Sequence, residues 1–203
     1  MLWRISLSIT NFITFASPMI YQNLIIYGIP FFLSLDIFFL SISGGVTLQP
    51  YRWSSSLKVS IVFSLSQIIA GFIGLLISSL ILPLISEFSF IAGVILVGFF
   101  GSKMMQEAVK VKNEERTYLI ENNEILYPLA LASSLNTFVI FVGLGFLEAS
   151  YIISLSVLFI SIFFVSQFGQ FIGSHYKPIR LGRSSKLLGG FLIIVLLILK
   201  FIL

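Results

Sequence analysis

Long apolar runs separated by short polar stretches dominate the chain. Six segments contain the roughly 20 mostly apolar residues that a helix needs to cross about 30 Å of hydrocarbon. They are residues 24–47, 57–83, 88–105, 127–147, 150–174 and 186–203. The pattern therefore predicts an all-α, polytopic membrane protein with six transmembrane helices.

Residues 1–22 do not fit this pattern well, because polar residues interrupt a short apolar stretch between Ile5 and Ala16. Three interpretations are open: a signal-like segment behind Arg4, an interfacial helix, or an over-long start with Met19 as the initiator. We favour these over a seventh span. The rest divides into a three-span unit at 23–105, a loop at 106–126 and a second three-span unit at 127–203.

Composition supports a membrane protein and excludes several other classes. Hydrophobic residues make up 58% of the chain and charged residues 10%, whereas a soluble domain carries about 25% charged residues. The main partner is therefore the lipid bilayer. There is no Cys and only one His, which excludes thiolate sites and leaves no obvious nucleophile–base pair for an enzyme. We expect no enzymatic activity.

Basic residues predict the orientation. Ten of the twelve Lys and Arg residues lie in or at the edges of the loops between spans 1 and 2, 3 and 4, and 5 and 6, and the other two connections contain none. The ten are Arg52, Lys58, Lys103, Lys110, Lys112, Arg116, Lys177, Arg180, Arg183 and Lys186. Basic loops stay on the cytoplasmic side. The chain should therefore lie in the plasma (inner) membrane with both termini outside. This bias also explains the net charge of +4 without nucleic-acid binding.

An internal repeat relates the two three-span units. Ser34-Leu35-Asp36 recurs as Ser134-Leu135-Asn136, and Ser66-Gln67 recurs as Ser166-Gln167, both with a shift of 100 residues. Three spans per unit make the second unit start from the opposite side of the membrane. The sequence thus predicts two inverted three-helix repeats, an arrangement in which transporters place the substrate near the midplane.

Asp36 and Asn136 are the main candidate site residues. Asp36 lies near the middle of the first span, where an ionisable side chain is costly and usually serves a substrate or proton. Asn136 occupies the equivalent place in the fourth span. Because the two are related by the repeat, we expect them to converge in the interior.

Four further polar residues complete the predicted substrate-binding set: Gln67, Gln167, Ser34 and Ser134. Gln67 shares a helix face with small residues, so it could line a pathway or join two helices. For a metal ion, the predicted ligands are Asp36, Asn136 and Gln67.

Several motifs together resemble the bacterial manganese efflux pump family. They are Ser34-Leu35-Asp36 with Ser41 and Gly44, Ser133-Ser134-Leu135-Asn136 with Gly143 and Gly145, the segment 91–107, and Gly169 to Ser174 followed by a basic loop and Leu187-Leu188-Gly189-Gly190. The resemblance runs from about residue 24 to the C-terminus. It implies membership of a lysine-exporter-like superfamily of small six-span exporters, export of Mn²⁺ as substrate, and ion handling by intramembrane acids, with no resident cofactor.

The chain departs from that family pattern at two acidic positions. Asn136 stands where the pattern has Asp, and Gln67 stands where it has Glu, so Asp36 alone keeps its charge. Mn²⁺ favours oxygen ligands, which amides supply without negative charge. The loss of two charges should weaken dication binding, but from the resemblance we still predict an exporter of divalent cations, with Mn²⁺ as the main candidate and Asp36 and Asn136 as the core of its site. The alternatives are an exporter of another small solute or ion, and a non-transporting membrane scaffold or regulatory protein.

Overall fold

The computed structural model describes residues 2–48, 50–110, 119–147, 151–176 and 179–202. Over these residues the regular structure is helical throughout. The order is α1 (Leu2–Gly45), α2 (Trp53–Ile81), two short 3₁₀ turns η1 (Leu82–Leu84) and η2 (Ser86–Phe88), α3 (Ser89–Lys110), α4 (Asn123–Phe146), α5 (Tyr151–Tyr176) and α6 (Ile179–Ile202). The all-helical prediction is confirmed.

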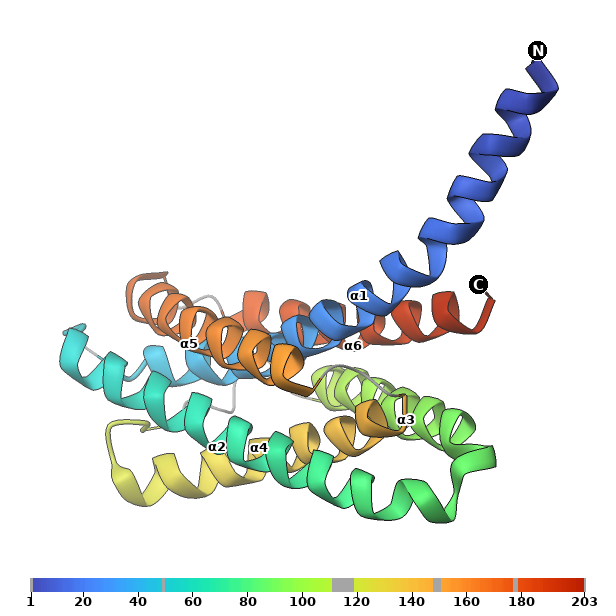
Figure 1. The fold of residues 1–203 in the computed structure, drawn as a ribbon. Helices are drawn as coiled ribbons and strands as arrows, with labels where there is room; N and C mark the ends of the chain where they lie inside the picture. The colour runs from blue at the N-terminus through green and yellow to red at the C-terminus, as the bar shows by residue number, and fades with distance from the viewer. Residues whose placement is uncertain (1, 49, 111–118, 148–150, 177–178, 203) are drawn as a thin grey trace.

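Among the residues that the structure describes, five segments are long and apolar enough to cross a membrane: Leu24–Gly45, Trp53–Leu84, Ser86–Lys110, Asn123–Phe146 and Ile152–Tyr176. They match the first five predicted spans, and α6 runs through the region of the sixth. Each helix runs opposite to the one before it, and the N-terminal part of α1 projects away from the bundle (Figure 1). Residues 2–22 are therefore the start of the helix that contains the first span.

The outward faces of α2, α3 and α5 carry large apolar side chains. Exposed examples are Leu65, Ile69, Phe72, Ile95, Phe99, Phe164 and Phe168. Polar side chains of α2 and α5 point inward instead, among them Ser60, Ser64, Gln67, Ser166 and Gln170. A surface of this kind suits lipid, because hydrocarbon offers no partners to polar groups.

The helices that contain Asp36 and Asn136 are the most enclosed of the five candidate spans. The buried share is 67% for the span in α1 and 61% for α4, against 22–33% for the spans in α2, α3 and α5. The larger contacts of α1 are with α5 and α6, and those of α4 are with α2 and α3. Further contacts join α2 to α5 and α3 to α6. Side chains of α1 and α4 therefore project into the interior.

Local sequence explains where several helices begin and end. Asn122 caps α4 by accepting a hydrogen bond from the Glu124 backbone N–H at 2.9 Å, which satisfies a free donor of the first turn. Pro83 follows α2 and falls in the η1 turn, since proline lacks the N–H that would continue the helix.

Two of the basic residues that we assigned to loops belong to helices and have side chains that are at least partly enclosed by the bundle, which corrects that part of the prediction. Lys103 belongs to α3 and Lys186 to α6, and the Lys186 side chain is buried. Their charges pair with groups of the interior, so the loop bias rests on the other basic residues.

Glycines allow the helices to approach closely. A Cβ atom on Gly74 of α2 would lie 2.5 Å from the Phe138 carbonyl oxygen of α4, and one on Gly45 of α1 would lie 2.5 Å from the Gln170 carbonyl oxygen of α5. Small residues at such contacts are typical of helix packing in membranes, where close van der Waals contact drives association.

We expect Gly74→Ala to destabilise the bundle by about 1–3 kcal/mol, because the added methyl group must push α4 away. Thermal unfolding of the purified protein in detergent would measure the loss as a lower midpoint. Gly98→Ala is the matched control, since its nearest atom would be Leu197 Cδ1 at 3.6 Å. Equal midpoints for the two variants would contradict the close contact.

Candidate functional site

Asp36 lies in the interior and pairs with a lysine from another helix. It lies near the middle of the membrane span Leu24–Gly45 in the C-terminal half of α1, and the residue is only 3% exposed. Its Oδ1 atom lies 2.7 Å from the Nζ atom of Lys186 on α6. Lys186 is itself only 7% exposed. A charged Asp in this position is therefore compensated by an equally buried positive charge, as burial of an ion requires.

The same lysine contacts a second carboxylate. Lys186 Nζ lies 2.8 Å from Glu107 Oε2 on α3, so the ammonium stands between the carboxylates of Asp36 and Glu107. Glu107 Oε1 in turn lies 3.7 Å from Lys103 Nζ, one turn earlier on α3. Negative and positive side chains therefore alternate in the order Asp36, Lys186, Glu107 and Lys103.

Asn136 of α4 contacts both Asp36 and Lys103 and so joins the two ends of this series of charges. Its Nδ2 atom donates to Asp36 Oδ2 at 3.3 Å, and its Oδ1 atom accepts from Lys103 Nζ at 3.1 Å. Five side chains from four helices thus form a closed circuit, which we call the ion-pair ring: Asp36, Lys103, Glu107, Asn136 and Lys186.

The ring runs from a buried side to a more accessible edge. Asp36 and Lys186 are almost fully buried, whereas the side chains of Lys103 and Glu107 are 41% and 38% exposed. Two carboxylates and two ammonium groups give the ring a formal charge of zero. Charges at the buried side interact more strongly, because the surrounding dielectric is lower there.

The predicted pairing of Asp36 and Asn136 is thus found in the structure, but Gln67 is engaged elsewhere. Gln67 Nε2 donates to Ser133 Oγ at 2.9 Å, and Gln67 Oε1 accepts from Thr137 Oγ1. These contacts use both ends of the amide to join α2 to α4. Gln67 therefore acts as an interhelical contact here, separate from the ring.

Gln167 and Ser34 also lie apart from the ring. Gln167 Oε1 accepts from Ser56 Oγ at 2.6 Å, which joins α5 to the start of α2. Ser34 donates to the Phe31 carbonyl oxygen of its own helix at 2.6 Å. Neither contact involves Asp36 or Asn136.

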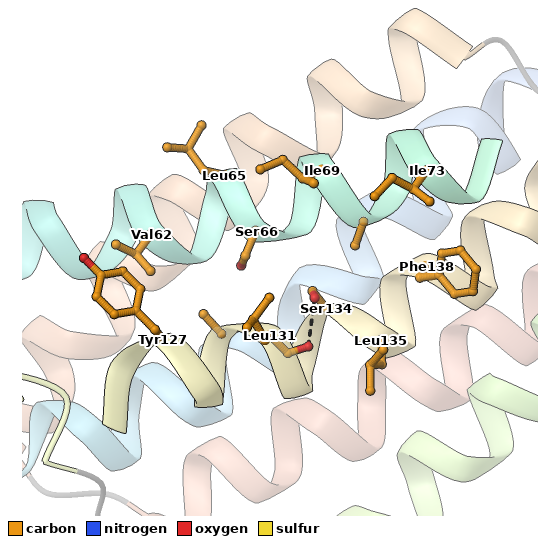
Figure 2. Close-up of a pocket in the computed structure, with 12 residues that line it drawn as sticks. Val62, Leu65, Ser66, Ile69, Ile73, Tyr127, Leu131, Ser134, Leu135 and Phe138 are labelled. Carbon is orange, nitrogen blue, oxygen red and sulfur yellow. Dashed lines mark hydrogen bonds between the residues drawn. The ribbon is translucent and has the colours of Figure 1, made fainter. Parts of the chain in front are cut away.

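Ser134 lies in an apolar groove between α2 and α4 (Figure 2). Its hydroxyl donates to the Leu131 carbonyl oxygen at 2.8 Å. The groove has a volume of about 460 Å³ and is lined by Val62, Leu65, Ser66, Ile69, Ala70, Ile73, Tyr127, Ala130, Leu131, Ser134, Leu135 and Phe138. Apart from the two serines and Tyr127 these are apolar, so the groove suits a hydrocarbon chain better than an ion.

The ring contains the oxygen donors that a hard cation would need. Asp36 and Glu107 supply carboxylate oxygens, and Asn136 supplies a carbonyl oxygen; such ligands suit Mg²⁺, Ca²⁺ and Mn²⁺. Among the described residues no three acidic or His side chains gather into a ready metal cluster. The ammonium of Lys186 stands between the two carboxylates instead.

Sequence reasoning missed three members of the ring. Lys103 and Lys186 were assigned to loops, and Glu107 to the start of the loop at 106–126. One available signal was the spacing of Lys103 and Glu107, four residues apart and thus on one face of any helix that continues past residue 105. A second was the position of Lys186 directly before the apolar run that starts at Leu187.

Comparison with known proteins identifies relatives over most of the chain. Residues 50–202 match the family described as "Putative manganese efflux pump". The protein named "Putative manganese efflux pump MntP" of Citrobacter koseri is 28% identical over 166 residues, which cover 81% of this chain and 88% of the relative. The protein of the same name from Rippkaea orientalis is 26% identical over 162 residues, covering 80% and 86%. No solved structure matches the chain.

We expect Asp36 and Lys186 to be energetically coupled. Asp36→Asn and Lys186→Gln should each destabilise the protein, while the double variant should lose less than the sum of the two. The difference should be about 1–3 kcal/mol, since each single change leaves a buried charge without its partner. Unfolding of the four proteins in detergent would measure it. Additive losses would show that the two charges do not interact.

Proposed function

We propose that the chain, which belongs to the manganese efflux pump family, exports Mn²⁺ from the cytoplasm with the ion-pair ring as its cation site. The observation that carries this proposal is the burial of Asp36 near the middle of the span Leu24–Gly45, in contact with Asn136 and Lys186. An ionisable side chain inside a membrane bundle usually marks an ion or proton pathway. The names of the relatives from Citrobacter koseri and Rippkaea orientalis support manganese as the substrate.

The donor atoms of the ring also support a divalent cation as the substrate. The ring holds carboxylate oxygens from α1 and α3 and an amide oxygen from α4, and these five side chains include no sulfur or imidazole. That donor set favours hard or intermediate dications over soft ones.

We also propose that the bundle consists of two inverted repeats, α1–α3 and α4–α6, with six membrane spans. Exchanging the two halves would turn the α1–α5 and α1–α6 contacts into α4–α2 and α4–α3 contacts, and all four are present. The exchange would also swap Asp36 with Asn136, whose side chains are in contact. Both observations support the repeat, and α6 would supply the sixth span.

The proposed orientation places the loops 1–2, 3–4 and 5–6 in the cytoplasm. Contacts between helix ends support a common side for them. Lys58 at the start of α2 bonds to Asn123 at the start of α4, and Arg183 near the start of α6 donates to the Val109 carbonyl near the end of α3 at 3.2 Å. Basic residues at this end would favour the cytoplasm.

We expect Asp36→Asn to reduce Mn²⁺ export roughly ten-fold or more, because the amide keeps the size of the side chain but removes the negative charge that a dication needs. Cells that express the variant should retain more manganese after a Mn²⁺ challenge, measured by elemental analysis. Immunoblotting of membranes would establish equal insertion.

Glu87→Gln is the matched control for that experiment. Glu87 is an exposed carboxylate in η2, outside the ring, so the same chemical change there should leave export intact. Normal export by the Asp36 variant would overturn the proposed cation site. Absence of Mn²⁺ export by the unaltered protein would overturn the proposed function.

The orientation can be tested with single cysteines, since the chain contains none. Glu87→Cys should react with a membrane-impermeant thiol reagent in intact cells, because η2 lies at the proposed outer end. Glu121→Cys, exposed just before α4, should react only after the cells are permeabilised. The reverse pattern would show that both termini face the cytoplasm.

A further inference from the structure

We propose that Lys186 is a tethered competitor of the transported cation: its ammonium fills the site between Asp36 and Glu107 when no ion is bound, and an incoming cation displaces it. This inference rests on the proposed function of the ring as a cation site. It adds a residue with a defined role in releasing the ion and resetting the site.

The geometry of the ammonium resembles that of a bound cation. Lys186 Nζ lies 2.7 Å from Asp36 Oδ1 and 2.8 Å from Glu107 Oε2. It thus makes two close contacts with carboxylate oxygens that belong to different helices. A cation that binds both carboxylates must occupy the same space, so the two cannot be present together.

The position of Lys186 also controls the approach to Asp36. Glu107 is the more accessible of the two carboxylates, with a side chain 38% exposed, while that of Asp36 is 5% exposed. A cation that arrives from the side of Glu107 meets this carboxylate first. To reach Asp36 it must then take the place of the ammonium.

Charge balance favours the return of the Lys186 ammonium to Asp36 and the release of the bound cation. The ring is formally neutral in the structure, with Asp36 and Glu107 opposed by Lys103 and Lys186. A dication that binds with both lysines still close would leave an excess of two positive charges in a poorly solvated place, which is unfavourable. Return of the Lys186 ammonium to Asp36 after the ion leaves restores neutrality. The lysine should therefore weaken cation binding and speed release.

A purely structural role for Lys186 makes the opposite prediction for ion affinity. If the lysine only stabilises the bundle, removing its charge should loosen the site and weaken cation binding or leave it unchanged. If it competes with the ion, removing its charge should strengthen binding. Affinity therefore separates the two roles, whereas stability alone does not.

The experiment compares Mn²⁺ binding to the purified full-length protein and to Lys186→Gln in detergent, by electron paramagnetic resonance of free Mn²⁺. The glutamine amide can still donate a hydrogen bond to Asp36 but carries no charge. We expect binding about ten-fold tighter or more in the variant and slower export in cells. Lys110→Gln, which removes an exposed charge from the last turn of α3, should bind as the unaltered protein does.

Two further results test the same idea. Lys186→Arg, which keeps the positive charge, should bind Mn²⁺ much more weakly than Lys186→Gln does. Equal or weaker binding by Lys186→Gln compared with the unaltered protein, or no binding by either, would overturn the proposal. Mn²⁺ export by the unaltered protein would then still stand on its own, so the two failures are distinguishable.

A measurement on the unaltered protein covers the case in which Lys186→Gln fails to fold. Displacement of the ammonium should make Lys186 more reactive toward a small amine-modifying reagent when Mn²⁺ is added, as read by mass spectrometry of the modified peptide. Lys110 is the internal reference and should not change. Unchanged protection of Lys186 at saturating Mn²⁺ would overturn the proposal.

Discussion

The buried charge of Asp36 is the constraint on which the interior of this protein depends. Placing an Asp at the centre of a membrane helix costs about 2.5–3.5 kcal/mol on insertion scales, and a carboxylate without partners costs more. The compensation comes from Lys186 on α6 and Asn136 on α4, and Glu107 on α3 holds the same lysine. The charge of Asp36 in α1 therefore constrains the positions of α3, α4 and α6, which supply its direct and indirect partners.

Close helix contacts make that compensation geometrically possible. A Cβ atom on Gly189, three residues after Lys186, would lie 2.7 Å from the Phe32 carbonyl oxygen of α1. A Cβ atom on Gly190 would lie 2.7 Å from the Gly101 carbonyl oxygen of α3. The absence of side chains at these two glycines therefore allows α6 to lie close to α1 and α3, the two helices that carry Asp36 and Glu107. Because long side chains lose entropy when they are held in place, short distances between backbones favour a well-ordered ring.

Much of this arrangement follows from the sequence, but not its central lysine. The hydropathy pattern predicts the first five spans within a few residues of their observed bounds. The repeat shift of 100 residues predicts that Asp36 and Asn136 approach each other, and their side chains are in contact. Lys186 was missed because a basic residue at the edge of an apolar run is also what a cytoplasmic loop provides. Gln67 was a candidate because it shares a helix face with small residues and stands where the family pattern has Glu. Neither feature tells which neighbouring side chains take up the amide; Ser133 and Thr137 do so here. Long-range pairing of this kind depends on helix rotation, which a hydropathy pattern does not fix.

The amide at position 136 has a physical explanation in the same ring. Asn136 donates to Asp36 with its nitrogen and accepts from Lys103 with its oxygen. A carboxylate at this position could accept from Lys103 but could not donate to Asp36, and the two negative charges would repel each other. It would also change the ring from formally neutral to a net charge of −1. The resemblance to the efflux pump family implies an acid at this position. Asn136 instead suits an ion-free state in which two lysines already balance two carboxylates. Under the proposed exchange, the charge of the incoming cation, rather than a third acid, would then displace Lys186.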